Sequence, residues 1–557
     1  MPKAFGEGLV KRTSACRNPS PNPSQREGDR KKSGRRMSTY DVIAIGAGHN
    51  GLVAAAYMAQ AGKKVLVLER NPWFGGGVVT KELTVPGFRH DQHSMAHIFI
   101  RANPLLKNDE LGLMSKFGLR YVVPELPMMS VFEDGTTLGL YRDRERTVAE
   151  ISKFSKKDGE AYRWLAEKAA GYMPMITSAL YTTPAPVGAT FAMMDQSREG
   201  REMWKFQQMS FHDLLCSLFE HDKVRMHFAR IAGENIVSPD EKMQGLGIFV
   251  FVGFMEAYGI GVPVGGSGKL TEALIASIKS NGGEVIGNSD VTNVIAKGGR
   301  ATGVVTKDGK EYTAKDGVIG AIHPHDIGKM VPGLDKDVVR LAEETEITGI
   351  GCITVHAALN APLKFKAPNV RGVMIELLPN DYITLRKSFD DLRYGDFSRY
   401  PLVGLGSLTM HDPSRAPAGK ATFHAWDYVC YDRPDGKSWD NTKSEYADKM
   451  IAHMGKFIDN VDGNIIAYHC DTPVDMERTS STFRRGDLHG IAATSYQSSA
   501  HRPTPDLGMN KVPGCDRLYL VGPFQYPGGG VFGAGRAAAI RMAEDLKIDL
   551  DKAIKRK

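Results

Sequence analysis

The order of apolar and polar positions after residue 40 predicts two strands with a helix between them. Residues 41–45 and 64–68 are short apolar runs rich in Val, Ile and Leu, which are typical of buried parallel strands. Residues 52–61 are rich in alanine and contain a single β-branched residue, so we expect a helix there that ends at Gly62. This part of the chain therefore predicts a β–α–β unit.

Further along the chain the pattern changes from helical to mixed. Residues 109–232 are predicted to be mainly helical, with one apolar face formed by Tyr162, Leu165, Ala169 and Tyr172. Further strands are expected at 284–286, 291–296, 301–306, 317–321, 353–359, 373–378 and 517–522, and further helices at 269–280, 444–458 and 534–546.

This arrangement predicts an α/β fold with two interleaved domains. A Rossmann-type nucleotide-binding domain would be assembled from three discontinuous segments, 37–108, 260–346 and 507–550. An α+β substrate-binding domain would take the segments between them, 109–259 and 347–506. A chain of 557 residues is long enough for large cores and a deep internal cavity.

The turn between the first predicted strand and helix carries a G-x-G-x-x-G motif. Gly46, Gly48 and Gly51 form it, with His49 and Asn50 inside. The first glycine permits a tight turn, the second lets backbone amides approach a pyrophosphate, and the third allows close packing of helix on strand. In the context of a β–α–β unit the motif predicts a dinucleotide site at the start of the helix.

An acidic residue stands where this dinucleotide motif needs one. Glu69 ends the second predicted strand, 23 residues after Gly46. A carboxylate there can accept hydrogen bonds from the ribose hydroxyls of adenosine. A glycine-rich packing turn alone does not account for this acid, so nucleotide binding is the interpretation we favour.

The net charge of +7 belongs to the first 36 residues. This segment holds ten Lys and Arg but three acids, so the rest of the chain is formally neutral and gives no indication of a nucleic-acid partner. The segment is rich in Pro, Ser, Gly and Arg, and we expect a disordered basic tail. An organellar transit peptide and a nucleic-acid-binding arm are alternatives, but we favour Met37 as the natural start.

The cysteines and the longest apolar run indicate in which cellular compartment the protein is expected. Six cysteines without a C-x-x-C pair do not form a disulfide framework, which favours a reducing compartment. The apolar run 246–255 is about half the length that a membrane-spanning helix needs, and we expect it to be a buried segment. A cytoplasmic protein is therefore expected, and peripheral contact with a membrane stays open.

Four stretches together resemble a known family of flavoproteins. They are 46–69, 69–88, 263–304 and 518–536. In order and spacing they are similar to the FAD-dependent oxidoreductases of the phytoene desaturase-like branch of the amine oxidase superfamily, in particular the pyridine nucleotide-disulphide oxidoreductase domain 2-like flavoproteins. The likeness covers most of residues 40–546 and is specific for fold and cofactor, but weak for substrate.

The resemblance implies FAD as the cofactor, held by loops from all three segments of the nucleotide-binding domain. Glycine clusters let the backbone run along the cofactor, and the closing helix would point its positive end at the flavin. The implied FAD-binding residues are Gly46, Gly48, His49, Asn50, Gly51, Glu69, Arg70, Gly75, Gly76, Gly77, Val78, Val291, Gly522, Gly529, Gly530, Val531 and Ala534.

Two departures from the family pattern lie at positions expected near the flavin. Tyr526 stands where the family often has a histidine, and Gly77-Val78 stand where many relatives carry an arginine. The substrate or reaction is therefore expected to differ from carotenoid desaturation. Tyr526 and His93 are our candidates for catalytic residues, with a packing role as the alternative for Tyr526.

The histidines near residue 93 raise the question of a metal. His90, His93 and His97 follow an i, i+3, i+7 spacing, but Asp91 is the only acidic partner and cysteines are absent nearby. Because the segment also fits a cofactor loop, we predict no metal site there. Lining of the cavity and ordinary structural hydrogen bonding are the two alternatives.

The sequence therefore predicts an FAD-dependent oxidoreductase. It would transfer a hydride from a small apolar, conjugated or aromatic molecule to flavin N5 and pass electrons to O2, a quinone or another acceptor. A flavin-dependent isomerase or saturase is the alternative within enzymes, and a flavin-stabilised interaction protein without turnover is the alternative outside them. Self-association is left open.

Overall fold

A mixed sheet of seven strands forms the first layer of the fold. The computed structural model describes residues 38–555, and the predicted basic tail of residues 1–36 lies outside the described residues. The strand order is β10–β11–β12–β1–β2–β9, and β18 pairs with β12 beside this path. The strands are β1 (Ser38–Ile45), β2 (Val65–Leu68), β9 (Glu284–Ile286), β10 (Val291–Lys297), β11 (Arg300–Thr306), β12 (Glu311–Gly320) and β18 (Leu518–Leu520).

This first sheet draws its strands from stretches far apart in the sequence. Strand β1 runs parallel to β2 and β12, and β18 runs parallel to β12. Three helices pack together beside it, namely α1 (His49–Gln60), α11 (Gly268–Ser280) and α17 (Gly535–Leu546). Their buried faces share one apolar core with β1 and β2. The predicted strands and helices are confirmed here, although β12 begins at Glu311, earlier than the expected strand.

A second seven-stranded sheet has the order β17–β13–β16–β15–β14–β6–β7. Its strands are β6 (Met128–Phe132), β7 (Thr137–Leu140), β13 (Ile350–Leu359), β14 (Met374–Leu378), β15 (Gly404–Gly406), β16 (Ala421–Cys430) and β17 (Ile465–Asp471). The prediction that residues 109–232 are mainly helical misses β6 and β7. Every residue of β6 is buried, so the strand lacks the alternation that would distinguish it from a buried helix.

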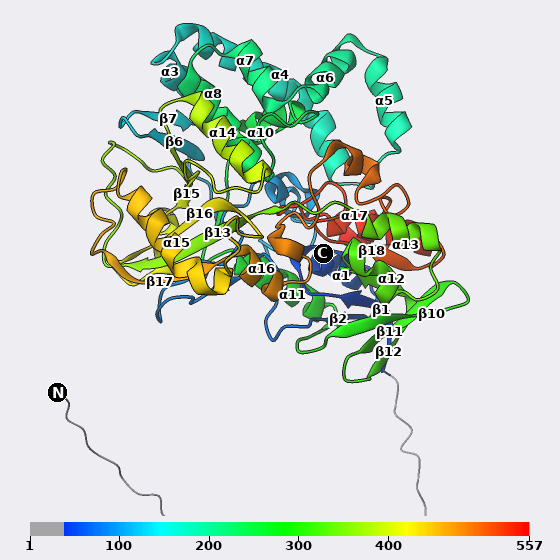
Figure 1. Ribbon diagram of the computed structural model, residues 1–557. Coiled ribbons are helices and arrows are strands. Elements are labelled where there is room, and N and C mark those ends of the chain that lie inside the picture. The colour runs from blue at the N-terminus through cyan, green and yellow to red at the C-terminus, as the bar shows by residue number, and fades with distance from the viewer. Residues whose placement is uncertain (1–37, 556–557) are drawn as a thin grey trace, which may run out of the picture. The chain divides into compact units, whose positions relative to one another are not determined.

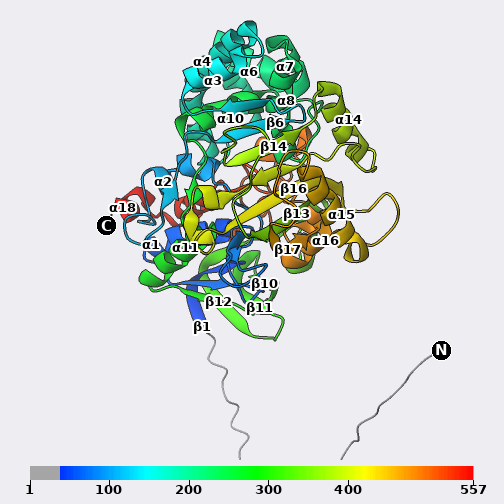
Figure 2. The ribbon, with the colours of Figure 1, turned by 90° about the vertical axis from the view of Figure 1, so that its left-hand side faces the viewer.

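A group of helices lies against this second sheet. They are α3 (Arg144–Ser152), α4 (Lys156–Leu180), α5 (Val187–Asp195), α6 (Arg198–Gln208), α7 (Phe211–Leu218), α8 (Asp222–Ala229) and α10 (Leu246–Ala257). In both views the labelled helices of this group lie at the top, strands β13 and β16 lie below them, and β10–β12 lie lowest (Figures 1 and 2). The predicted apolar face of α4 is buried, and the apolar run near residue 250 is helix α10.

The structure has further α-helices and two pairs of short strands. They are α2 (Pro104–Lys107), α9 (Ile231–Glu234), α12 (Ile327–Met330), α13 (Lys336–Glu343), α14 (Tyr382–Arg393), α15 (Trp439–Met454), α16 (Pro473–Thr479), α18 (Leu550–Lys555) and the two-stranded pairs β3 (Thr80–Lys81) with β4 (His90–Asp91) and β5 (Tyr121–Val122) with β8 (Val262–Pro263).

Helix α15 differs from its prediction at both ends. It begins at Trp439 because the Ser438 side chain accepts a hydrogen bond from the Asp440 amide and caps the helix. It ends before Gly455, whereas the prediction carried it to residue 458. Among residues 38–555, no helix has both the length and the apolar character needed to cross a bilayer.

Candidate cofactor and substrate site

The glycine turn after β1 has the geometry that a dinucleotide loop requires. Gly46 has a φ of +87°, which favours glycine. A Cβ atom on Gly51 would lie 2.5 Å from the Gly46 carbonyl oxygen, so helix α1 packs tightly against the turn. A Cβ atom on Gly48 would meet no heavy atom within 4 Å. The turn is therefore closed on its protein side and open on its cavity side.

The N-terminus of α1 leaves polar groups without protein partners. Gly48 is the N-cap residue, so no side chain caps the helix, and the first turn carries no acid. His49 Nε2 and Asn50 Oδ1 are buried and find no hydrogen-bond partner among the described residues. Burial lowers the pKa of His49 to about 4, so its ring is neutral at physiological pH. Free amides and unpartnered buried polar atoms fit an anionic, hydrogen-bonding ligand at this helix end.

The predicted ribose-binding acid is held in place by backbone amides. Glu69 is 8% exposed, and its two carboxylate oxygens accept hydrogen bonds from the Ala47 amide at 2.8 Å and the Asn71 amide at 2.9 Å. A carboxylate oxygen has lone pairs for more than one donor, so Glu69 can still accept from a ligand hydroxyl. Arg70 is exposed, and Val291 lies at the start of β10; both line the same cavity as Glu69.

The second glycine cluster is joined to the first. The Gly75 amide donates to the Ala47 carbonyl at 2.8 Å, and Gly48 and Gly75 form a parallel bridge. Gly76 has a φ of +58°, and a Cβ atom there would lie 3.1 Å from the Cα atom of Gly48. Gly76, together with the neighbouring positions 77–78, lines the cavity, whereas Gly75 is buried behind it. The two loops therefore form one continuous wall.

The loop before α17 forms another wall. Gly522 and Gly530 have φ values of +140° and +95°, and both line the cavity with the neighbouring Gly529 and Val531. Helix α17 follows with no side-chain cap and no acid in its first turn. Ala534, its N-cap residue, does not line the cavity.

Two helix N-termini meet at the dinucleotide end of this site. A Cβ atom on Gly535 would lie 1.9 Å from the Asn50 carbonyl oxygen, so the uncapped starts of α1 and α17 are in direct contact. Helix N-termini carry a partial positive charge and favour negatively charged ligands. The residues at this end therefore fit a cofactor that carries a diphosphate and extends from Glu69 to the loop before α17.

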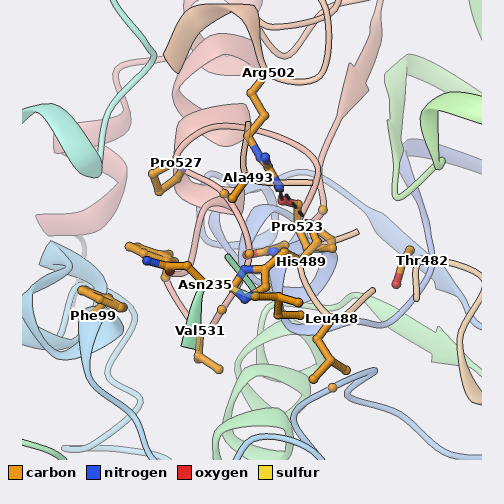
Figure 3. A pocket seen from close by; sticks show the side chains of 18 of the residues that line it. Phe99, Asn235, Thr482, Leu488, His489, Ala493, Arg502, Pro523, Pro527 and Val531 are labelled. Atoms are coloured by element: carbon orange, nitrogen blue, oxygen red, sulfur yellow. Dashed lines mark hydrogen bonds between the residues drawn. The ribbon is translucent and has the colours of Figure 1, made fainter. Parts of the chain in front are cut away.

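These walls enclose a cavity of about 830 Å³. Away from the glycine loops its lining is mainly apolar and aromatic, and Figure 3 shows Phe99 and Leu488 in this part. Phe99 stacks on Phe532 with ring centroids 4.4 Å apart. Other apolar lining residues are Leu180, Phe191, Met194, Trp204, Val250, Phe251, Met374, Trp426 and Phe483.

Many polar side chains, mainly Ser, Thr, Asn and Gln, also line this part of the cavity. The Arg502 guanidinium donates to the Pro523 carbonyl at 3.0 Å and the His489 carbonyl at 2.9 Å (Figure 3). Because burial dominates, the pKa of Arg502 is lowered to about 10, which leaves it charged at neutral pH. Tyr428, another lining residue, donates to Glu234 at 3.0 Å. These hydrogen bonds hold the polar side chains of Arg502 and Tyr428 in fixed positions at the cavity wall.

The two candidate catalytic residues both line this cavity. Burial raises the pKa of Tyr526 to about 12, so its phenol stays protonated at physiological pH. Burial lowers the pKa of His93 to about 4, and both of its ring nitrogens lack hydrogen-bond partners among the described residues. Tyr526 is thus a possible donor and not a base, whereas His93 is a neutral imidazole.

The three histidines near residue 93 do not converge. A ring nitrogen of His90 lies 2.9 Å from the Thr84 hydroxyl, and His97 Nδ1 lies 2.8 Å from the Tyr121 hydroxyl. Of the three, His93 is the one that lines the cavity. Within residues 38–555 no group of three His, Cys, Asp or Glu side chains is arranged to hold a metal ion.

Sequence reasoning missed much of the substrate end. His489 and Arg502 line the cavity, but no sequence pattern assigned either of them a role. Thr354, His424 and Trp426 lie on strands that are buried along nearly their whole length, so no periodicity distinguishes the cavity-facing positions. Only the register of the second sheet identifies them.

Comparisons with known proteins agree with this geometry. A family model described as flavin containing amine oxidoreductase matches residues 51–534. Pyridine nucleotide-disulfide oxidoreductase domain-containing protein 2 of Mus musculus is 28% identical, over 98% of this chain and 99% of that protein. A limonene dehydrogenase polypeptide of Castellaniella defragrans is 27% identical, over 92% of this chain and 95% of that protein. The solved structure of an oxidoreductase from Methanosarcina mazei has a TM-score of 0.57 at 17% identity, over 90% of this chain and 99% of that one, which shows a shared fold.

Proposed function

The chain belongs to the family of flavin-containing amine oxidoreductases, and on this premise we propose that it oxidises a small apolar or conjugated molecule. Membership makes the protein an FAD-dependent oxidoreductase. It also confirms the predicted resemblance to the phytoene desaturase-like branch. The family does not specify the substrate, which has to be argued from the cavity.

The observation that carries the proposal is the apolar, aromatic lining beyond the glycine loops. Phe99, Phe251 and Trp426 contribute to a wall that can hold a hydrocarbon by burial of its surface. The name of the relative from Castellaniella defragrans refers to limonene, an apolar molecule of the same kind.

The residues at the glycine loops would hold FAD. We assign the diphosphate to the open side of Gly48 and to the start of α1, and the adenosine ribose to Glu69. Residues 529–531 and the start of α17 would lie along the ring system. When bound, FAD supplies the acceptor for a hydride and its electron pair.

The protein's own side chains would position the substrate and handle its proton. The apolar walls exclude water and orient the C–H bond. Tyr526, with its pKa raised by burial, can donate a hydrogen bond but cannot accept the substrate proton as a base at neutral pH. His93 is neutral and both of its ring nitrogens lack partners among the described residues, so its ring can accept a hydrogen bond or relay a proton at the cavity wall.

Further features of the proposal concern the rest of the molecule. We propose the predicted domain division, with 37–108, 260–346 and 507–550 as the FAD-binding domain and the two intervening segments as the substrate-binding domain. The composition of the two sheets supports it. We also propose O2 or a quinone as the electron acceptor, together with a cytoplasmic location.

The test is an anaerobic screen of purified holoenzyme against terpenoid, aromatic and amine panels. Bleaching of the oxidised flavin absorbance by an apolar terpenoid or aromatic compound is the expected result. Bleaching by hydrophilic amines alone would contradict the apolar substrate class. Turnover only after prior reduction of the flavin, with no net electron consumption, would favour the isomerase or saturase instead.

A further inference from the structure

Three histidines form a row across the second sheet. His356 on β13 is directly opposite His424 on β16 and His469 on β17. Residues opposite each other in antiparallel strands point to the same face of a sheet. The ring centroids of His356 and His424 are 4.3 Å apart, and those of His356 and His469 are 6.3 Å apart. We refer to His424, His356 and His469 as the histidine row.

The row leads from the cavity to the surface. At one end His424 lines the cavity, as do the nearby Thr354 and His93. At the other end the side chain of His469 is 34% exposed, and its Nε2 atom lies 2.9 Å from an Asp471 carboxylate oxygen. His356, between them, is fully buried.

The inner members of the row have unused hydrogen-bonding capacity. Both ring nitrogens of His356 and of His424 are buried without a partner among the described residues, as are both nitrogens of His93 and the Thr354 hydroxyl. Buried polar groups in this state are normally satisfied by internal water. A neutral imidazole has one donor and one acceptor nitrogen, so imidazoles bridged by water form a chain that can pass a proton along.

The charged and titratable groups around the row act in both directions. His90 and His93 oppose protonation of the inner rings, whereas the carboxylates of Asp91 and Asp471 favour protonation of His424. Lys81 and Arg415 act on the neighbouring His93 and His90. Arg415 pairs with Asp91, its Nη1 atom 2.5 Å from a carboxylate oxygen.

Burial is the main cause of the low pKa values along the row. It lowers the pKa of His424 to about 3 and that of His356 well below its usual value. Burial alone would raise the pKa of Asp471, but hydrogen bonds from His469 and Gln92 hold it below the usual value. The carboxylate at the outer end is therefore charged at neutral pH, and its negative charge favours movement of a proton toward this end of the row.

We propose that the histidine row conducts a proton from the cavity to the solvent. The proposal rests on the proposed function, in which two C–H bonds of the substrate break. One hydrogen leaves as hydride with its electron pair, and the electron pair of the other bond becomes the new double bond. The second hydrogen is a proton, which has to leave a cavity with largely apolar walls. It would pass from His93 or His424 through His356 to His469 and Asp471, and each ring returns to neutrality afterwards.

The decisive comparison is between proton release and flavin bleaching in a single turnover. Stopped-flow absorbance follows bleaching, and a pH indicator dye in weak buffer follows the proton released to solvent. Variants His356→Leu and His356→Gln interrupt the row, and the second keeps a polar side chain in case the first does not fold. His453→Leu is the matched control, because His453 on α15 is also buried, has a low pKa caused by burial and has an unpartnered Nε2 atom, but lies off the row.

In the wild type we expect proton release to keep pace with bleaching. His356→Leu and His356→Gln should delay proton release at least tenfold, and His453→Leu should not. A third variant, His356→Ala, leaves space for a free imidazole, and added imidazole should restore its proton release. Proton release at the wild-type rate in both His356 variants, or bleaching without release in the wild type, would overturn the proposal while the proposed function stands. If no apolar compound bleaches the wild type, the proposed function fails instead.

A second measurement needs no turnover. In holoenzyme labelled with ¹⁵N-histidine, we expect the ring nitrogens of His356 and His424 to give signals of neutral, hydrogen-bonded imidazoles between pH 6 and 8. Signals of rings without hydrogen bonds, or of rings bound to a stoichiometric metal ion, would overturn the proposal, because neither can transfer a proton.

Discussion

At the scale of single residues, the sequence predicted the dinucleotide end of the cavity better than its substrate end. His49, Asn50, Glu69 and Tyr526 all line the cavity, because a motif places them at known offsets from glycines. His424 could not be predicted in this way. The register of the strands places it opposite His356, a residue 68 positions earlier in the chain, and only this register makes it part of a site.

We expect Glu69→Ala to weaken FAD binding about 10- to 100-fold, because the variant loses one or two hydrogen bonds from the ribose to the carboxylate. Equilibrium dialysis of FAD against the apoprotein measures the change. Because Glu69 also accepts bonds from the Ala47 and Asn71 amides, the apoprotein should lose some stability as well. Glu272→Ala is the control, since Glu272 is exposed on α11, and it should bind FAD normally. Equal FAD affinity in Glu69→Ala and wild type would refute the ribose assignment.

Tyr526→Phe tests the role of a phenol whose pKa burial raises to about 12. Since the hydroxyl is protonated at every pH up to about 10, removing it should lower kcat by less than about tenfold and leave the pH profile of kcat/KM unchanged between about pH 6 and 10. The measurement is the pH dependence of both constants with a substrate found in the screen. Loss of a basic limb from the profile in the variant would mean that Tyr526 titrates during catalysis.

At the scale of secondary structure, most elements were predictable where periodicity or a glycine marks them. Helices α1, α11 and α17 and strands β9 to β11 follow the prediction closely. The misses have local physical causes. Strand β6 is buried along its whole length and shows no alternation, and the start of α15 depends on the capping side chain of Ser438.

Alanine substitutions at two glycines of the turn before α1 should affect the stability of the apoprotein differently. An alanine at Gly51 would place Cβ 2.5 Å from the Gly46 carbonyl oxygen, so Gly51→Ala should destabilise the apoprotein by about 1–3 kcal/mol. Gly48→Ala has open space and an ordinary φ of −65°, so it should change apoprotein stability by less than about 0.5 kcal/mol.

In Gly48→Ala the added methyl group would stand on the cavity side, where we assign the diphosphate. FAD retention should therefore fall at least tenfold although the fold is intact. Thermal unfolding of the two apoproteins and their flavin content after gel filtration separate the effects. Normal flavin content in Gly48→Ala would place the diphosphate elsewhere.

At the scale of the whole molecule, assembly from discontinuous segments was predictable, but the contacts between those segments were not. The sequence indicated separated segments for each layer, and the sheets draw their strands from such segments. The cavity forms where residues from both layers face each other, and no local pattern predicts that. Many histidines are buried in the interior around this cavity, and we expect them to make the stability of the fold depend on pH.

We predict steep acid destabilisation. Burial lowers the pKa of these histidines to about 3 or 4: His49, His90, His93, His97, His227, His323, His424, His453 and His489. A depressed folded-state pKa gives stability that is present above the unfolded value near 6.5 and is lost as the pH falls toward the folded value. Each such group costs about 1.4 kcal/mol per pH unit in that window.

Buried acids oppose this effect but are fewer. Burial raises the pKa of Asp427 and Asp487 to about 6 and also raises that of Glu376, so these groups stabilise the fold as the pH falls through those values. The net expectation is a Tm that drops sharply between about pH 6.5 and 5, measured by calorimetry of the apoprotein. The slope should be shallower in His453→Leu. A Tm that stays constant over this range would show that the histidines are not held neutral.

The most direct test of the central claim is the mass of the product formed in a single anaerobic turnover. Holoenzyme in excess is mixed with an apolar substrate that bleaches its flavin, and the extract is analysed by mass spectrometry. The account predicts a product lighter than the substrate by two hydrogens, with one product molecule per flavin bleached. A product heavier than the substrate by one oxygen atom would contradict it, because the two electrons would then leave with addition of water and not with formation of a double bond.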